Sequence, residues 1–414
     1  MCLIKIVNNQ LLIQPIESII SHNQFKPFIA LCTGLKNTRV DTWQSPSQID
    51  IEEDGNARIT IERKRNGLRL RIRNLTQNDQ GTLKCLGFDQ DGKSFSNTLQ
   101  IVVKATLSKS RKLRNIPSCA TWSKNGTIVA GSSNGAAGND STALNTPGPF
   151  DIDVDGTLYI VDNGNNRIMQ WKNGAMSGAQ IGGFINQPRE IFVSSTGNIY
   201  LTDLKPNFND FDEMYKYDSI TNSWVTIIRK LFGRPIGFYV DEDRALVYVA
   251  DYRNNIIMSY DLNGAALGPV AGVESADGND SYHLVDPSDV FVDEFSNYLY
   301  VADSVNNRIQ RFKIGEKTGV TVAGVEIGCE VNIPVDVVIT SNGDIYALEL
   351  FKNRIMKVTN NFTPKCVCIL GCPDSQSFYS PDSFQFDTNG NLYVIDSQQH
   401  TVLKFNISLD NCGM

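Results

Sequence analysis

The stretch PSDVFVDEFSNYLYVADSVNNRIQRF, from Pro287 to Phe312, decides the fold. It joins a proline, a short apolar strand, a polar turn, the run YLYVAD and the run NNRIQRF. The same order recurs along the last three hundred residues or so, with its second-strand tyrosine at Tyr159, Tyr200, Tyr248, Tyr300, Tyr346 and Tyr393. Successive copies therefore begin about 41 to 52 residues apart, which is the length of a four-stranded β-propeller blade.

Within each copy, apolar residues alternate with period two, as at Val290 and Val292 or at Leu299 and Val301. Gly, Asn and Asp gather between these runs, where turns are needed. No stretch shows sustained helical periodicity, and none offers the eighteen or so continuous apolar residues of a membrane span. The sequence predicts an all-β protein with no transmembrane segment.

The two ends of the repeat region indicate how the ring closes. The last copy ends after Thr401–Phe405 without a fourth strand, and Thr127–Gly131, before the first copy, has the sequence of the missing one. A strand from the N-terminal end would then complete the last blade and remove a free sheet edge. Cys119 and Cys412 flank the chain ends that must meet, so we expect a disulfide between them.

The amino-acid sequence of the copies resembles that of the NHL-repeat family, whose repeats contain the approximate motifs P-x-G-I/V-x-V-D, L-Y-V-A-D and N-x-R-I. The resemblance covers about residues 117 to 412 and includes all six copies. It implies a six-bladed propeller. It does not choose a function, because such propellers serve as protein-binding, RNA-binding, extracellular and enzymatic modules.

The first hundred residues resemble an immunoglobulin-like domain of the cell-adhesion kind. Cys32, Trp43 and Cys85 have the spacing of an inter-sheet disulfide packed against a tryptophan, and Asp79, Gly81 and Cys85 match the motif before the second cysteine. Leu83 stands where that motif has its corner tyrosine. We therefore expect an Ig-like β-sandwich at 1–104, a basic linker at 105–116 and the propeller at 117–414.

The net charge of −7 conceals two opposite halves. Residues 1–115 hold 18 Lys and Arg against 10 Asp and Glu, whereas residues 116–414 hold 20 against 35. Nucleic-acid affinity comes from basic side chains that neutralise phosphates. An acidic propeller therefore argues against a nucleic-acid partner.

Cysteines and glycosylation motifs point to an extracellular or cell-surface location. Cys32 with Cys85 and Cys119 with Cys412 make two sensible bridges, while local disulfides, free thiols or zinc remain open for Cys329, Cys366, Cys368 and Cys372. Six N-x-S/T motifs offer glycosylation sites at Asn74, Asn125, Asn139, Asn279, Asn361 and Asn406. The N-terminal residues do not form a convincing signal peptide, so we expect that an upstream segment is missing from the sequence.

Two sets of acidic residues recur in the propeller. The acid that ends each second strand (Asp162, Asp203, Asp251, Asp303, Glu349, Asp396) is expected to hold the following turn, or to pair with Arg167 or Arg308. The residues two positions after the blade-opening prolines, where the family commonly has glycine, are Asp151, Glu190, Gly237, Asp289, Asp336 and Ser383, and four of them are acids. We expect these four carboxylates to face the channel mouth, where they either bind a cation such as calcium or cap turns.

Three function classes follow from these features. The sequence favours a non-catalytic recognition or adhesion protein, and Arg69, Arg71 and Arg73 on one strand face are candidates for binding an anionic glycan or an acidic partner. One alternative is a calcium-dependent hydrolase of the lactonase type, or a relative of the peptide-amidating lyases. The lyases place zinc-binding histidines directly after the blade-opening proline, where this chain has none. The other alternative is an intracellular NHL adaptor of the ubiquitin pathway, although no zinc-binding RING precedes the propeller.

Overall fold

The computed structural model describes residues 114–205, 212–231, 233–359 and 365–412, together with the backbone of the strands within residues 1–113. The chain divides into two compact units, Met1–Lys109 and Ser110–Met414. Among the described residues, no helix has both the length and the apolar character needed to cross a membrane.

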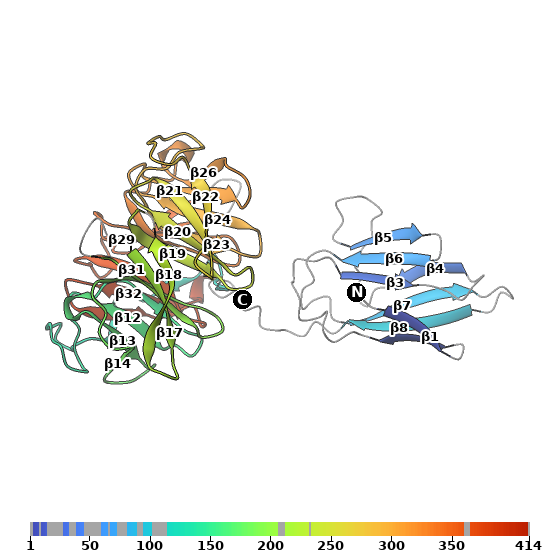
Figure 1. Cartoon of the computed structure of the whole chain (residues 1–414), viewed down its shortest axis with the longest axis horizontal. Coiled ribbons are helices and arrows are strands. Elements are labelled where there is room, and N and C mark those ends of the chain that lie inside the picture. Colours follow the sequence, from blue (N-terminus) through green and yellow to red (C-terminus); the bar gives the residue numbers. More distant parts are fainter. Residues whose placement is uncertain are drawn as a thin grey trace. The chain divides into compact units, whose positions relative to one another are not determined.

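The described strands of the first unit form three small sheets (Figure 1). One sheet has the order β3 (Phe28–Cys32), β6 (Gly67–Ile72), β5 (Ile59–Lys64), and another has the order β4 (Arg39–Gln44), β7 (Gly81–Phe88), β8 (Ser94–Ile101). A hairpin of β1 (Leu3–Val7) and β2 (Gln10–Gln14) makes the third. All of these strand pairs are antiparallel.

The described residues of the second unit form six four-stranded antiparallel sheets, which are the blades of a propeller (Figure 1). Blade 1 contains β11 (Phe150–Ile152), β12 (Leu158–Asp162), β13 (Arg167–Trp171) and β14 (Ala179–Ile181). Blade 2 contains β15 (Pro188–Val193), β16 (Ile199–Asp203), β17 (Asp212–Asp218) and β18 (Ser223–Leu231). Blade 3 contains β19 (Pro235–Asp241), β20 (Leu246–Asp251), β21 (Ile256–Asp261) and β22 (Ala266–Gly272). Blade 4 contains β23 (Pro287–Asp293), β24 (Tyr298–Asp303), β25 (Arg308–Lys313) and β26 (Gly319–Ala323). Blade 5 contains β27 (Pro334–Ile339), β28 (Ile345–Glu349), β29 (Arg354–Val358) and β30 (Cys366–Leu370).

Blade 6 confirms the predicted closure of the ring. Its sheet contains β31 (Pro381–Phe386), β32 (Leu392–Asp396), β33 (Thr401–Phe405) and, as the outer strand, β10 (Thr127–Ala130). A second pair, β9 (Thr121–Trp122) with β34 (Ile407–Ser408), holds the chain ends together, and a disulfide joins Cys119 to Cys412 beside it. Three short 3₁₀ turns complete the described elements: η2 (Asn163–Asn165), η3 (Val325–Ile327) and η4 (Asp410–Cys412).

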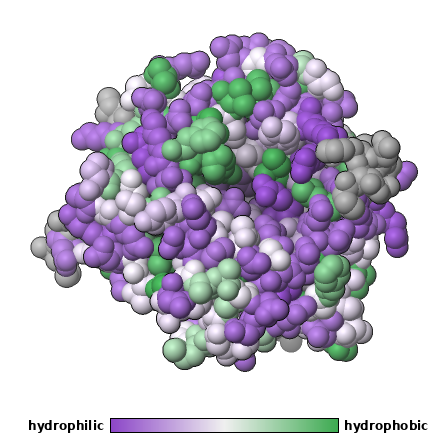
Figure 2. Space-filling model, turned by 90° about the vertical axis from the view of Figure 1, so that its left-hand side faces the viewer, coloured by the Kyte–Doolittle hydropathy of each residue, from purple (hydrophilic) through white to green (hydrophobic). Residues whose placement is uncertain are grey.

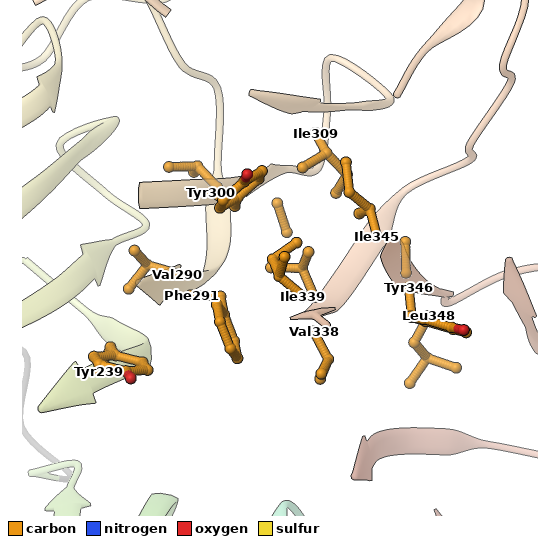
Figure 3. Close-up of a cluster of buried hydrophobic side chains, with 14 of the residues drawn as sticks. Tyr239, Val290, Phe291, Tyr300, Ile309, Val338, Ile339, Ile345, Tyr346 and Leu348 are labelled. Atoms are coloured by element: carbon orange, nitrogen blue, oxygen red, sulfur yellow. The ribbon is translucent and has the colours of Figure 1, made fainter. Parts of the chain in front are cut away.

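The second strand of each blade is buried on both faces rather than on one. In β24, Leu299, Val301 and Ala302 have no exposed surface, and Tyr300 is only 6% exposed. Neighbouring blades pack against both faces of each sheet, so apolar side chains on both faces enter the core. Figure 3 shows part of this core, in which side chains of β19, β23, β24, β27 and β28 lie together.

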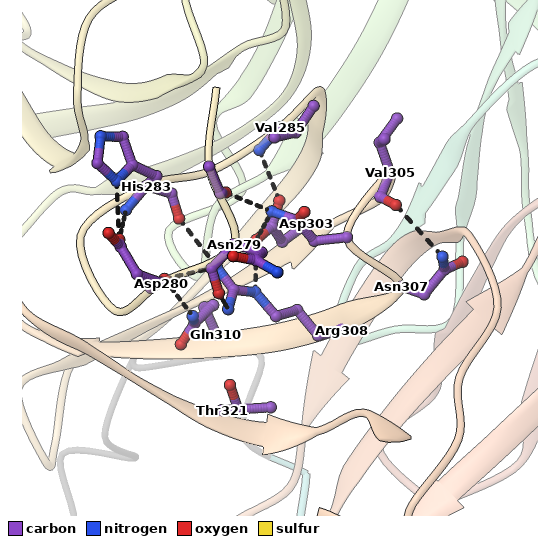
Figure 4. Close-up of polar contacts among 12 residues, drawn as sticks. Asn279, Asp280, His283, Val285, Asp303, Val305, Asn307, Arg308, Gln310 and Thr321 are labelled. Carbon is purple, nitrogen blue, oxygen red and sulfur yellow. Dashed lines mark hydrogen bonds and ion pairs between the residues drawn. The ribbon is translucent and has the colours of Figure 1, made fainter. Parts of the chain in front are cut away.

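The acid that ends each second strand holds the scaffold, as the sequence predicts. Asp303 accepts hydrogen bonds from the backbone N–H of Val285 (2.7 Å) and from Nε of Arg308 (2.7 Å) (Figure 4). Asp162 does the same with Asn145 and Arg167. Each carboxylate thereby ties the end of a second strand to the loop that leads into the inner strand of its own blade.

Candidate functional site

The inner strands surround a cavity of about 400 Å³ at the end of the channel where they begin. Nine of its 24 lining residues stand one or two positions after a blade-opening proline of blades 2 to 6. From blades 2, 4 and 6 these are Arg189, Glu190, Ser288, Asp289, Asp382 and Ser383, and from blades 3 and 5 they are Ile236, Val335 and Asp336. The recurring proline therefore marks the site, because it starts each inner strand at the cavity.

Blade 1 departs from the register that the sequence suggests. Asp153 Oδ1 accepts the N–H groups of Asp155 and Thr157, as Asp387 Oδ1 accepts those of Asn389 and Asn391 in blade 6. Asp387 lies six residues after Pro381, so the equivalent proline of blade 1 is Pro147 rather than Pro149. Position two of blade 1 is then Pro149, which lines the cavity.

Asp151 consequently does not belong to the ring of acids at the mouth. Its position matches that of Phe192, Phe291 and Gln385, because all four are paired with the second-strand tyrosine of their blade. The side chain is only 1% exposed and is not part of the cavity wall. Of the four acids predicted at the mouth, Glu190, Asp289 and Asp336 line the cavity.

Three of the four acids join neighbouring blades. Asp289 Oδ2 accepts the N–H of Val337 (3.0 Å), and Asp336 Oδ2 accepts the N–H of Phe384 (2.9 Å). Asp151 Oδ2 likewise accepts the N–H of Val193 (2.6 Å) on the next blade. Asp151 lies two positions further along its inner strand than Asp289 and Asp336 do. An inner strand is a sheet edge whose outward N–H groups need acceptors. These carboxylates supply acceptors from the preceding blade.

Glu190 behaves differently from these aspartates. Within the described residues its carboxylate accepts one hydrogen bond, from the adjacent N–H of Ile191 (3.0 Å). Burial raises the pKa of Glu190 well above its ordinary value, and the charges of Asp289 and Asp336 raise it further; the hydrogen bond from Ile191 and the charge of Arg189 oppose this rise with smaller effects. Glu190 is thus an acid at the cavity that no blade-to-blade contact explains.

Arg189 and Asp382 are two further charged residues of the wall, and they have opposite signs. Burial raises the pKa of Asp382, and the positive charge of Arg189 partly offsets that rise. Asp382 reaches the backbone of blade 1 at Gly148, where an added Cβ would lie 3.5 Å from its Oδ2. The part of the wall near blade 1 therefore carries both charge signs.

The outer lip of the cavity is apolar on the side of blades 3 to 5. Tyr252, Val305 and Phe351 follow the acids that end β20, β24 and β28, and they are 37%, 52% and 72% exposed. Leu350 and Ile333 lie next to them on the wall. We call Tyr252, Val305 and Phe351 the apolar rim. Figure 2 shows one face of the molecule, on which hydrophobic residues gather beside a hollow.

The structure does not bring the four acids predicted for cation binding together in one cluster. Among the described residues, no group of three or more His, Cys, Asp or Glu side chains could hold a metal ion. Asp289 and Asp336 each give an oxygen to a backbone N–H of the next blade, and Asp151 lies elsewhere. What the cavity presents is a set of hydrogen-bond acceptors in its wall and an apolar surface above them.

Other predicted positions lie away from the cavity. Disulfides join Cys329 to Cys366 and Cys368 to Cys372, with Cα atoms 5.4 and 6.0 Å apart. Four predicted glycosylation sites are exposed: Asn125, Asn139, Asn279 and Asn406. Outside the described residues lie Asn74, Asn361 and the side chains of Cys32, Cys85, Arg69, Arg71 and Arg73.

Sequence reasoning missed the apolar rim, the place of Arg189 and Asp382 on the cavity wall, and the true start of blade 1. One signal could have located the start. Asp153 precedes Tyr159 by six residues, as Asp387 precedes Tyr393. Counting back from this aspartate gives Pro147 in blade 1 and Pro381 in blade 6. The rim has no such signal, because Tyr252, Val305 and Phe351 are different residue types in turns of similar sequence.

Comparisons with known proteins place the fold. Neither a scan of protein-family models nor a search of curated proteins finds a match. Among solved structures, the chain is similar to a structural-genomics protein of unknown function from Bacteroides thetaiotaomicron, with 12% identity, a TM-score of 0.57 and coverage of 92% of this chain and 100% of that one. It is also similar to an auxiliary nutrient binding protein of the same organism, with 10% identity, a TM-score of 0.51 and coverage of 91% and 92%. At these identities the likeness concerns the fold alone.

Proposed function

We propose that this chain is an extracellular recognition protein of the NHL-propeller type, which binds its ligand at the channel mouth and catalyses no reaction. The observation that carries the proposal is the cavity itself. It has a volume of about 400 Å³ and combines acceptor groups in its wall with an exposed apolar rim. Ligand sites are typically concave and mostly apolar, with a few convergent polar groups.

The extracellular location is supported by the disulfides. All six cysteines whose side chains the structure describes are paired, in three bridges. Disulfides persist in oxidising compartments and are rare in the cytosol, which speaks against the intracellular adaptor. The similar nutrient binding protein is a binding protein by name, which agrees with a ligand-binding role.

We further propose that the first unit is an immunoglobulin-like domain. Its strands support this assignment, because Cys32 ends β3 in one sheet while Cys85 lies in β7 of another. Trp43 in β4 is the register partner of Cys85. A disulfide between two sheets with a tryptophan beside it is the hallmark of that fold. Alignments that cover 92% of the chain also extend beyond the propeller unit, Ser110–Met414.

A cavity-filling variant tests the binding site. The full chain would be screened against a glycan array and a peptide library, and each hit measured again with Val305→Trp. Val305 is 52% exposed on the rim, so the larger side chain can be accommodated while it covers the mouth. The matched control is Val320→Trp, at a position that is 56% exposed on the outer strand β26.

We expect Val305→Trp to weaken binding at least about tenfold, which corresponds to about 1.4 kcal/mol, and Val320→Trp to leave it unchanged. Ligands that bind both variants alike, or a complete absence of ligands, would contradict a site at the mouth. Hydrolysis of a panel of lactones and aryl esters in millimolar calcium should not exceed the rate in buffer. Turnover that Glu190→Gln abolishes would instead establish an enzyme.

A further inference from the structure

We propose that the ligand of the channel mouth is a basic, apolar peptide segment of a partner protein. A lysine or arginine side chain would enter the cavity toward Glu190, and an apolar neighbour of that residue would cover the rim of Tyr252, Val305 and Phe351. This inference rests on the proposed function and names the ligand class of the same site.

Charge is the first reason for this assignment. The cavity wall contains five carboxylates and one guanidinium, Arg189. The carboxylates are those of Glu190, Asp286, Asp289, Asp336 and Asp382. The surrounding propeller adds to the negative potential, because residues 116–414 hold 35 acidic against 20 basic side chains. A concave site with low-dielectric walls concentrates such a field and attracts cations.

The shape and polarity of the rim are the second reason. Tyr252, Val305 and Phe351 come from three consecutive blades and stand at equivalent turns, so they form one lip over the acids. A small inorganic cation would leave this lip exposed to water. A peptide covers it with a side chain next to the basic residue and thereby removes apolar surface from water.

The volume of the cavity also suits a side chain better than a large ligand. About 400 Å³ lies toward the small end of the range for ligand pockets, roughly 300 to 1,000 Å³. One long basic side chain fits within such a space, with its aliphatic stem on the apolar walls and its head among the carboxylates. Ile236 and Val335 provide those apolar walls between the acids.

Glu190 is the residue we expect to receive the cation. It lines the cavity, and within the described residues its carboxylate accepts a hydrogen bond only from the N–H of Ile191, whereas Asp289 and Asp336 each accept one from the next blade. Its pKa is raised by burial and by the other two acids. A cation in the cavity stabilises the ionised form, so binding should release a proton and strengthen as the pH rises.

Fluorescein-labelled five-residue peptides test the assignment on the full chain. The probe has one lysine between two phenylalanines, with glycine at both ends, and is compared with the same peptide carrying acetyl-lysine. The protein is measured as wild type, as Glu190→Gln and as Glu316→Gln. Glu316 is an exposed acid on the turn after β25, so its replacement changes the net charge equally without touching the cavity.

We expect the lysine peptide to bind at least about tenfold more tightly than the acetyl-lysine peptide, because charge-assisted hydrogen bonds are about twice as strong as neutral ones. Glu190→Gln should reduce this preference to about threefold or less, while Glu316→Gln retains it. The preference should also fall with added salt and rise with pH in the wild type. Arginine in place of lysine should keep the preference.

The possible failures can be told apart. If both peptides bind equally and Val305→Trp weakens both, the mouth is a binding site but the basic-peptide assignment is wrong. Glycans that bind in place of peptides, again in a manner sensitive to Val305→Trp, would overturn the peptide class alone. If Val305→Trp has no effect on any probe, the proposed function fails as well.

Discussion

Removal of the Cys119–Cys412 disulfide should destabilise the propeller much more than removal of the Cys368–Cys372 disulfide. The first bond joins residues 293 positions apart and the second joins residues 4 positions apart. Loop-closure entropy grows as about 1.5RT ln n with loop length n, so the two bonds should differ by about 4 kcal/mol in their effect on the unfolded chain. The larger effect belongs to the bond that closes the ring.

The comparison uses paired serine variants of the full chain, C119S/C412S and C368S/C372S. Urea titrations followed by hydrogen-exchange mass spectrometry would report on propeller peptides separately from the first unit. The first variant should lose about 4 kcal/mol more unfolding free energy than the second, with protection lost first in β9, β10 and β34. Equal losses in the two variants would refute the loop-length argument. Early loss elsewhere in the ring would refute the role of this bond in closure.

Four further substitutions test other contacts. Glu294 is 8% exposed, and burial raises its pKa from 4.5 to about 7. The free energy of unfolding should therefore fall by up to about 3 kcal/mol as the pH rises across that interval. Urea titrations at several pH values should show that Glu294→Gln abolishes this fall. Arg308→Lys should cost about 2–4 kcal/mol by the same measurement, because a lysine cannot replace the several hydrogen bonds of the guanidinium. Gly237→Ala should lower the melting temperature, at a cost of about 1–3 kcal/mol, because its Cβ would lie 2.7 Å from the carbonyl oxygen of Ser288. Glu190→Gln should raise the melting temperature at neutral pH and lose that advantage in acid, because a buried carboxylate with a raised pKa stabilises the folded state only while protonated.

The propeller could be predicted from sequence because its repeat is a physical unit. Each copy contains a proline that starts the inner strand, alternating apolar residues that fill the core, and an acid that ties a strand end to the loop before it. Asparagine before the third strand is part of the same unit, since Asn166, Asn255, Asn307 and Asn353 have φ between 48° and 59°, in the left-handed region. Asn tolerates that region better than most residues. Ring closure could be predicted in the same way, because the last copy lacks a fourth strand and an extra strand with the matching sequence precedes the first copy.

The site could be predicted only in part, because its residues break the repeat. Two prolines close together, Pro147 and Pro149, offered two registers for blade 1, and spacing to the next proline could not choose between them. The hydrogen bonds of Asp153, which match those of Asp387, resolve the choice, and the six-residue spacing from Asp153 to Tyr159 agrees with them. The shift of two residues moves Asp151 away from the mouth to the contact between blades 1 and 2.

The inter-blade contacts also separate structural acids from the acid that we assign to binding. Asp151, Asp289 and Asp336 each satisfy an N–H of the next inner strand, so replacing any of them leaves a backbone donor without its acceptor. Glu190 satisfies only its own neighbour, and burial together with nearby negative charge disfavours its ionised form. A residue whose charge destabilises the folded state is best explained by a role in ligand binding. This contrast, rather than the number of carboxylates at the mouth, is why the binding assignment rests on Glu190.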